Sequence, residues 1–268
     1  MSKTIPAALA VITGASSGIG AAYAERLAAR GHALMLVARR AERLAELKAG
    51  LEQRHGASVV TITADLENPD DLHRLESRLG DGGAGMLINN AGAGGLGPLA
   101  ASSADQLERI VRLNVLALTR LSHAALKGFR KAGAGVLVNI GSVIAFAPSA
   151  AGAVYSGSKA YVHNFTRSLQ LEYAKSDIRV QLVMPGPVRT EFFSSQGLSD
   201  SIFADESYVT PETLVDAALA GLDAEEAVTT PTLTRAGVWE ALEAARVGFI
   251  EATMSGKVAP RYVSGAAG

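Results

Sequence analysis

Tyr155 and Lys159 stand four residues apart in the stretch VYSGSKAYV, residues 154–162. Residues at this spacing are neighbours on one face of an α-helix, so a phenol and an ammonium would meet here. The ordinary alternative is a partly buried ring beside a surface charge. A cation about 4 Å from a phenol, at an effective dielectric constant of about 20, contributes about 4 kcal/mol, or roughly three pK units. We therefore expect Lys159 to lower the pKa of Tyr155 from about 10 toward neutral pH, where an acid/base catalyst works best.

A glycine-rich stretch, TGASSGIG at residues 13–20, lies between an apolar run and an amphipathic pattern. In an open parallel sheet such a loop places a helix N-terminus at the carboxyl end of a strand, where it binds phosphate. Glycines also let the backbone approach a pyrophosphate closely. The alternative is an ordinary glycine-rich turn. We expect six residues of the loop to contact a dinucleotide: Gly14, Ser16, Ser17, Gly18, Ile19 and Gly20.

The same loop matches the G-x-S-x-G elbow of serine hydrolases, at residues 14–18. That fold needs an acid and then a histidine late in the chain. The last histidine here is His163, in the middle of a helical pattern. The sequence therefore argues against a hydrolase.

Arg39 and Arg40 follow the second apolar run, nineteen and twenty residues after Gly20. Dinucleotide sites that bind NAD(H) carry an acid near this position for the ribose 2′-hydroxyl. A guanidinium instead offers forked, charge-assisted hydrogen bonds to a 2′-phosphate. The alternative is that both arginines begin a solvated helix face. We expect NADP(H) to be preferred over NAD(H).

Short apolar runs alternate with longer amphipathic patterns along the chain. The runs predict strands at 8–13, 33–38, 58–63, 85–89, 135–140 and 179–184. The patterns predict helices at 19–30, 41–54, 69–79, 104–131 and 152–175, with Asn68 and Pro69 starting the third. Nearly continuous apolar strands in this order predict an α/β fold with a doubly wound parallel sheet. Later helical patterns at 211–222 and 234–254 flank a short apolar stretch at 227–230.

The composition narrows the class of protein. The chain has 268 residues, a formal net charge of −1 and no cysteine, which excludes disulfides and thiol catalysis. Mixed charge argues against nucleic-acid and membrane partners, and the five histidines lack metal-ligand spacing. No apolar stretch reaches the ~18 residues of a membrane span, and the N-terminus reads as a strand. We expect a cytoplasmic, single-domain protein with a substrate loop or lid at about residues 189–225.

In its ordered motifs the sequence resembles the short-chain dehydrogenase/reductase family, over about residues 8–190. The motifs are TGASSGIG, ADL with Asp65, NNAG at 89–92, Asn114 in RLNVLAL, Ser142 thirteen residues before Tyr155, and MPGPVRT at 184–190. The resemblance implies a Rossmann-fold domain and further cofactor contacts from Asp65, Leu66, Asn90, Ala91, Gly92, Tyr155, Lys159, Pro185, Gly186, Val188 and Thr190. Ser17 stands where some NADP-binding members carry a basic residue.

By this resemblance, Asn114, Ser142, Tyr155 and Lys159 form the catalytic set of a hydride-transfer reaction between NADP(H) and a carbonyl or secondary alcohol. Tyr155 would protonate the developing alkoxide, and Ser142 would donate a hydrogen bond to the same oxygen. Lys159 would also bind the nicotinamide ribose, and Asn114 would hold a water that links Lys159 to solvent. Members of the family form homodimers or homotetramers, so we expect a homo-oligomer.

Apolar residues near this set predict a small apolar substrate, with core packing as the alternative for the aromatic ones. The predicted pocket walls are Val143, Ile144, Phe146, Phe192 and Phe193, with Gly94, Leu96, Phe203 and Tyr208 nearby. Arg189 would meet an acidic substrate group or lie at the surface. Two other functions remain open: a non-catalytic NADP-binding regulator, which would not need the catalytic set, and an isomerase, dehydratase or epimerase on the same scaffold.

Overall fold

The structure is a computed structural model that describes residues 8–196, 199 and 202–263. The chain divides into two compact units, Met1–Pro231 and Thr232–Gly268. The sheet described below lies in the first unit. That the whole chain, residues 1–268, is one domain stays a prediction.

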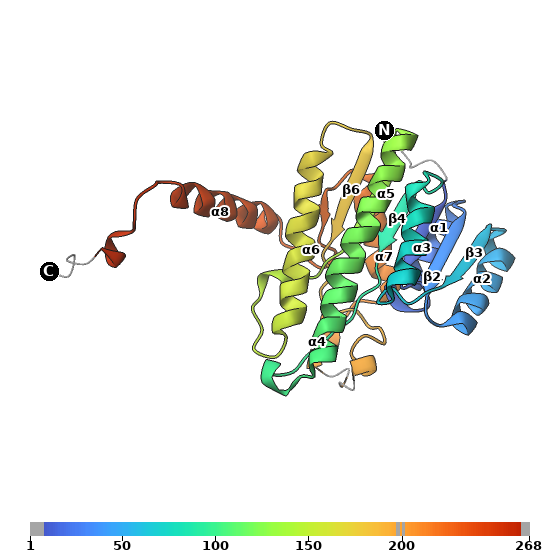
Figure 1. The fold of residues 1–268 in the computed structure, drawn as a ribbon, viewed down its shortest axis with the longest axis horizontal. Helices are drawn as coiled ribbons and strands as arrows, with labels where there is room; N and C mark the ends of the chain where they lie inside the picture. The colour runs from blue at the N-terminus through green and yellow to red at the C-terminus, as the bar shows by residue number, and fades with distance from the viewer. Residues whose placement is uncertain (1–7, 197–198, 200–201, 264–268) are drawn as a thin grey trace. The chain divides into compact units, whose positions relative to one another are not determined.

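Seven parallel strands form the sheet in the order β3-β2-β1-β4-β5-β6-β7 (Figure 1). They are β1 Ala10–Thr13, β2 Leu34–Ala38, β3 Val59–Thr63, β4 Met86–Asn89, β5 Gly135–Ile140, β6 Ile178–Val183 and β7 Val228–Thr229. The first six match the predicted strands, and β7 comes from the short apolar stretch and pairs with Leu182 and Val183. The strand order reverses between β1 and β4, which is where doubly wound sheets bind ligands.

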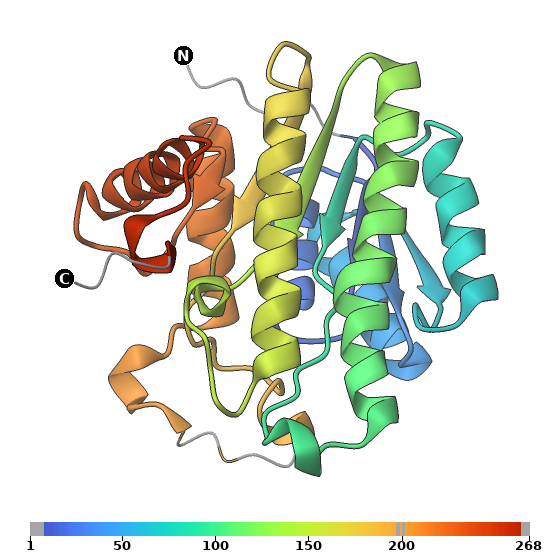
Figure 2. The ribbon, with the colours of Figure 1, turned by 60° about the vertical axis from the view of Figure 1, so that its left-hand side comes forward.

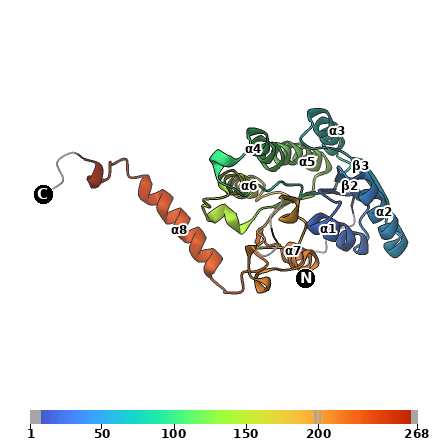
Figure 3. The ribbon, with the colours of Figure 1, turned by 90° about the horizontal axis from the view of Figure 1, so that it is seen from below.

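Helices cover both faces of this sheet (Figure 3). One face carries α1 Gly18–Ala29, α2 Ala41–His55 and α7 Pro211–Asp223. The other carries α3 Pro69–Gly80, α4 Ala104–Val111, α5 Leu118–Ala132 and α6 Ala153–Glu172, of which α5 (green) and α6 (yellow) lie in front of the strands in Figure 2. Two apolar clusters fill the layers, one on each side. The predicted doubly wound α/β fold is confirmed.

The start of α3 shows how the sequence fixes an element. Asn68 accepts hydrogen bonds from the amides of Asp70 and Asp71 at 2.9 and 3.2 Å, and Pro69 occupies the first turn. Both features were expected from the sequence, because an N-cap side chain satisfies amides that the helix leaves unpaired.

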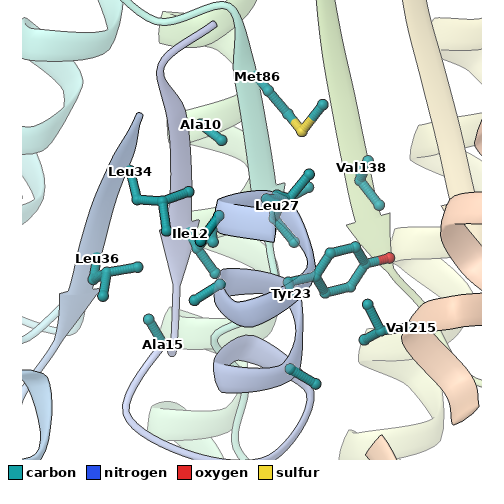
Figure 4. Close-up of a cluster of buried hydrophobic side chains, with 14 of the residues drawn as sticks. Ala10, Ile12, Ala15, Tyr23, Leu27, Leu34, Leu36, Met86, Val138 and Val215 are labelled. Atoms are coloured by element: carbon teal, nitrogen blue, oxygen red, sulfur yellow. The ribbon is translucent and has the colours of Figure 1, made fainter. Parts of the chain in front are cut away.

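The core beneath α1 fixes the glycine-rich loop against the sheet. Figure 4 shows the Tyr23 ring reaching from α1 toward Val138 of β5 and Val215 of α7. Tyr23 is fully buried, and burial raises the pKa of its phenol. The helix that follows the loop is therefore anchored by one of the largest buried side chains.

The second unit contains α8, Val238–Thr253, within the predicted helical pattern, and a 3₁₀ turn at Pro260–Tyr262. None of the described residues of α8 is buried, and its apolar residues Val247, Phe249 and Ile250 are exposed. Across the described residues of both units, no helix has the length and apolar character needed to cross a bilayer.

Candidate active site

A cavity of about 550 Å³ opens at the carboxyl ends of the strands. Most of its wall comes from the segments that follow β1, β2, β3, β4, β5 and β6, and helical segments add Leu113, Tyr155 and Lys159. Residues far apart in the sequence meet here because parallel strands end at one edge of the sheet. Most of the predicted cofactor, catalytic and substrate residues line this cavity.

The glycine-rich loop lies directly against the end of β4. Gly14 has a φ of +66°, and a Cβ atom on it would lie 2.8 Å from Asn90 Nδ2. A Cβ on Gly20 would clash with the carbonyl oxygen of Gly14. Thr13 Oγ1 accepts hydrogen bonds from the amides of Asn90 and Ala91, each at 3.0 Å. The loop therefore has no room for side chains at Gly14 and Gly20, and its residues Gly14, Ser16, Ser17, Gly18 and Ile19 line the cavity.

Tyr155, on α6, and Ser142, at the end of β5, both line the cavity. Burial raises the pKa of Tyr155 to about 12, and a hydrogen bond with Ser142 acts in the opposite direction. The prediction that the pKa of Tyr155 lies near neutral is therefore wrong. Lys159 Nζ lies 5.9 Å from the centroid of the Tyr155 ring, and desolvation of the phenol is the largest effect on its pKa.

Lys159 is half-buried in the cavity wall, and desolvation there lowers its pKa to about 8. Its Nζ donates a hydrogen bond to the carbonyl oxygen of Ile140 at 2.9 Å, and a Cβ on Gly92 would lie 4.0 Å from it. A lysine with this pKa exchanges protons close to physiological pH.

Asn114 lies in a π-helical segment, Arg112–Ala117, between α4 and α5. Its Oδ1 accepts from the amide of Ala93 at 2.8 Å, and its Nδ2 donates to the Ala93 carbonyl at 2.9 Å and to Ser158 Oγ at 3.0 Å. Ser158 in turn donates to the carbonyl of Tyr155 at 2.7 Å. Asn114 thus ties the loop after β4 to the helix that carries Tyr155. A water relay through Asn114 stays a prediction.

Arg40 lies beside the glycine-rich loop. Its Nη2 donates to Ser16 Oγ at 3.0 Å and to Ser17 Oγ at 2.6 Å, and its Nη1 lies 2.7 Å from Glu191 Oε2. Arg39 instead faces Glu67 at 3.6 Å, and Glu67 also binds Arg109 at 2.9 Å. The two predicted arginines are therefore not equivalent, because Arg40 joins the loop and Arg39 belongs to an acid-containing network.

The predicted substrate residues divide into two groups. Val143, Ile144, Phe192, Phe193, Leu96 and Phe203 line the cavity. Within the described residues, Phe146, Gly94 and Tyr208 are not part of its wall. Phe146 packs edge-on against His163, with ring centroids 4.7 Å apart, because it closes a 3₁₀ turn whose other residues, Val143 and Ile144, face the cavity. Phe146 was predicted to line the substrate pocket, but the structure places it outside the cavity wall.

The family model of the short-chain dehydrogenases matches residues 8–200. The chain belongs to this family. It is 33% identical over 217 residues to a very-long-chain 3-oxoacyl-CoA reductase of Anas platyrhynchos, covering 79% of this chain and 68% of that protein. The chain spans 53–68% of the length of the curated relatives that it matches. One human relative, 34% identical over 68% of this chain and 56% of its own length, is named an inactive hydroxysteroid dehydrogenase-like protein.

Two solved structures match nearly the whole chain. A short-chain dehydrogenase of Sphingobium yanoikuyae in complex with NADPH is 43% identical, with a TM-score of 0.91, covering 95% of this chain and all of that one. A bulky-bulky ketone specific alcohol dehydrogenase of Comamonas testosteroni is 40% identical, with a TM-score of 0.87, covering 97% of this chain and all of that one. These structures support the predicted family and fold.

Most of the predicted cofactor residues line the cavity: Gly14, Ser16, Ser17, Gly18, Ile19, Arg39, Arg40, Asp65, Leu66, Asn90, Ala91, Gly92, Tyr155, Lys159, Pro185, Gly186, Val188 and Thr190. Gly20 and Asn114 lie behind the wall and support it. The sequence reasoning missed Glu67 and Glu191, which also line the cavity, and Arg43, which binds Glu191. The one sequence signal that could have found Glu191 is its position directly after Thr190, which was a predicted cofactor residue. Part of the predicted loop, residues 197–198 and 200–201, lies outside the described residues.

Proposed function

We propose that the protein is an NADP(H)-dependent oxidoreductase that interconverts an apolar ketone or aldehyde and the corresponding alcohol. One observation carries the proposal. Ser142, Tyr155 and Lys159 line the same cavity as the glycine-rich loop and Arg40. An acid/base group, a hydrogen-bond donor and a nucleotide site are thus accessible to one bound pair of reactants.

The residues present fit a dinucleotide. Gly14 and Gly18 line the cavity without side chains, and the N-terminus of α1 begins at Gly18. Arg40, held by Ser16 and Ser17, offers a guanidinium for a 2′-phosphate, and NADPH is bound in the structure of the Sphingobium relative. When bound, NADPH supplies the hydride.

The proton comes from the protein. With a pKa of about 12, Tyr155 is protonated at neutral pH and donates to the substrate oxygen as negative charge develops there. Ser142 Oγ donates a hydrogen bond to the same oxygen and stabilises that charge. Lys159, with its pKa of about 8, returns a proton to the site at working pH. Asn114 is a positioning residue that holds the Tyr155 helix to the loop after β4.

The cavity wall supports an apolar substrate, and the name of one relative favours a bulky substrate over the small one predicted from the sequence. Leu96, Val143, Ile144, Phe192, Phe193 and Phe203 offer apolar surface around Tyr155. The Comamonas relative is named for ketones with two bulky substituents. Large apolar groups on both sides of the carbonyl would bury this surface.

The test is NADPH absorbance decay with a panel of ketones and aldehydes of graded bulk, run in parallel with NADH. We expect turnover with NADPH, the highest kcat/KM for diaryl or aryl-alkyl ketones, and slower turnover with NADH. Turnover with NADH equal to that with NADPH would contradict the cofactor preference. NADPH consumption with small polar carbonyls alone would contradict the substrate class.

A non-catalytic NADP-binding protein is the second candidate, because one relative is named inactive. The complete set of Asn114, Ser142, Tyr155 and Lys159 around the cavity favours an enzyme, since a binding protein needs only the cofactor residues. Tight NADPH binding without turnover across the panel would favour the binding protein. Product formation without net NADPH consumption would indicate an isomerase, dehydratase or epimerase.

A further inference from the structure

One carboxylate in the cofactor cavity bridges two guanidinium groups. Glu191 Oε2 lies 2.7 Å from Arg40 Nη1, and Glu191 Oε1 lies 2.6 Å from Arg43 Nη1. Both arginines lower the pKa of Glu191. Arg40 directly precedes α2 and Arg43 lies in its first turn, whereas Glu191 belongs to the segment after β6. The contact therefore joins the segment after β2 to the segment after β6.

This carboxylate occupies the guanidinium groups that a 2′-phosphate would use. Arg40 also donates to Ser16 and Ser17, so its Nη1 and the Arg43 Nη1 are directed at Glu191. Arg39 is directed at Glu67 instead. A phosphate monoester carries nearly two negative charges and three acceptor oxygens. Placed beside Arg40, it would lie next to the Glu191 carboxylate, and like charges at contact distance repel.

We propose that Glu191 competes with the 2′-phosphate of NADP(H) for Arg40 and Arg43, and that Arg43 is a second phosphate-binding residue. The inference rests on the proposed function, because it assumes that NADP(H) binds in this cavity. The side chains of Arg40, Arg43 and Glu191 are 41, 44 and 48% exposed. Exposed ion pairs add little net stability, so a doubly charged phosphate can displace the carboxylate.

The competition links cofactor binding to the aromatic wall of the cavity, formed by Phe192 and Phe193 beside Tyr155. Glu191 is followed by Phe192, whose ring centroid lies 5.5 Å from that of Tyr155 and 5.3 Å from that of Phe193. Displacing Glu191 releases an anchor of the backbone that holds Phe192 against the catalytic tyrosine. Binding of the 2′-phosphate and the position of this aromatic wall are then coupled, and coupling of this kind is reciprocal.

The test measures NADPH and NADH binding to the whole protein by calorimetry, with Glu191→Gln, Arg43→Gln and the control Glu46→Gln. Glu46 is exposed and lies three residues from Arg43 on α2, so its variant removes one nearby charge without touching the bridge. We expect Glu191→Gln to bind NADPH about tenfold more tightly, equivalent to about 1.4 kcal/mol, with NADH within about twofold. We expect Arg43→Gln to weaken NADPH binding about tenfold and Glu46→Gln to change neither.

A Glu191→Gln variant with unchanged NADPH affinity, or with the same gain for NADH, would overturn the competition. So would an equal gain in Glu46→Gln, since that would show a general charge effect. Unchanged NADPH binding in Arg43→Gln would overturn the role of Arg43. A wild type that binds no NADPH would overturn the proposed function as well, so the two failures are distinguishable.

The anchoring of the aromatic wall has its own readout, which needs no cofactor. Hydrogen–deuterium exchange of residues 190–196 should be faster in Glu191→Gln than in the wild type and in Glu46→Gln. Equal exchange in the three proteins would overturn the link between the bridge and Phe192.

Discussion

Tyr155 and Lys159 change their pKa values in opposite directions for the same reason. Burial raises the pKa of the phenol to about 12 and lowers that of the ammonium to about 8, because each neutral form is favoured away from water. The spacing of the two residues predicted that both would belong to one site. It could not predict their burial, which depends on how α6 packs at the end of β5, or the hydrogen bond that directs Lys159 to Ile140.

Lys159→Met should raise the stability of the protein at neutral pH while it removes activity. A pKa lowered from 10.5 to about 8 corresponds to a desolvation cost of about 3 kcal/mol, so we expect a gain of about 1–3 kcal/mol at pH 7. Between pH 8 and 10.5 the unfolded wild type binds more protons than the folded one, so wild-type stability rises there and the gain shrinks. Urea unfolding at pH 7 and pH 9.5 measures the difference. A less stable variant at pH 7, or a gain that does not shrink, would contradict the assignment.

The contact between Glu191 and Arg40 shows the limit of sequence reasoning at single residues. The two positions are 151 residues apart, and nothing local in either segment pairs them. Gly14 was predictable because its φ of +66° is a local requirement of the loop, whereas the contact of Asn90 with Gly14 and Gly20 was not. Phe146 was misplaced because neighbouring residues of one short turn face different surroundings.

At the scale of elements, the carboxyl ends of β1 and β4 are joined through one hydroxyl. Thr13 Oγ1 accepts from the amides of Asn90 and Ala91 and donates to the carbonyl of Ile88 at 3.2 Å. The sequence predicted both strands but not this bond. It also predicted one continuous helix at 104–131, whereas a π-helical segment interrupts it where Asn114 binds Ala93. Such interruptions often occur at functional sites and depend on tertiary contacts that periodicity does not record.

Thr13→Val should destabilise the protein by about 1–2 kcal/mol, because it leaves the partly buried amides of Asn90 and Ala91 without their acceptor. NADPH affinity should fall as well, since the hydrogen bonds of these amides to Thr13 Oγ1 hold the start of the glycine-rich loop against the end of β4. Thr63→Val, at an exposed position of β3, is the matched control and should change stability by less than about 0.5 kcal/mol. Chemical denaturation of both variants gives the comparison, and equal stabilities would argue against a role for the Thr13 hydroxyl.

At the scale of the whole molecule, the cavity and all seven strands lie in the first unit, Met1–Pro231. Alternation of apolar runs and helices made the sheet predictable, because parallel strands joined by right-handed crossovers leave few topologies. The two-residue strand β7 was the weakest signal, since two residues give no periodicity. A homodimer or homotetramer stays a prediction, which sedimentation velocity would test.

A chain ending at Pro231 should therefore keep the fold and the cofactor site. Within the part of the chain that the structure describes, no residue of α8 is buried, and neither core cluster includes a residue after Pro231. Removal of the second unit therefore takes no side chain from these clusters. We expect NADPH affinity within about threefold of the full chain, a change worth less than about 1 kcal/mol. Calorimetry and far-ultraviolet circular dichroism measure both properties. Loss of folding would show that the second unit supports the first.

The most direct test of the proposed chemistry is single-turnover NADPH oxidation by Tyr155→Phe with the best ketone of the panel. Phenylalanine keeps the ring that packs on Phe192 but removes the proton donor. We predict a fall in the hydride-transfer rate of about 10²–10⁴-fold, with NADPH affinity within about threefold of the wild type. A rate within about threefold of the wild type, at unchanged affinity, would contradict the assignment of Tyr155 as the acid/base group.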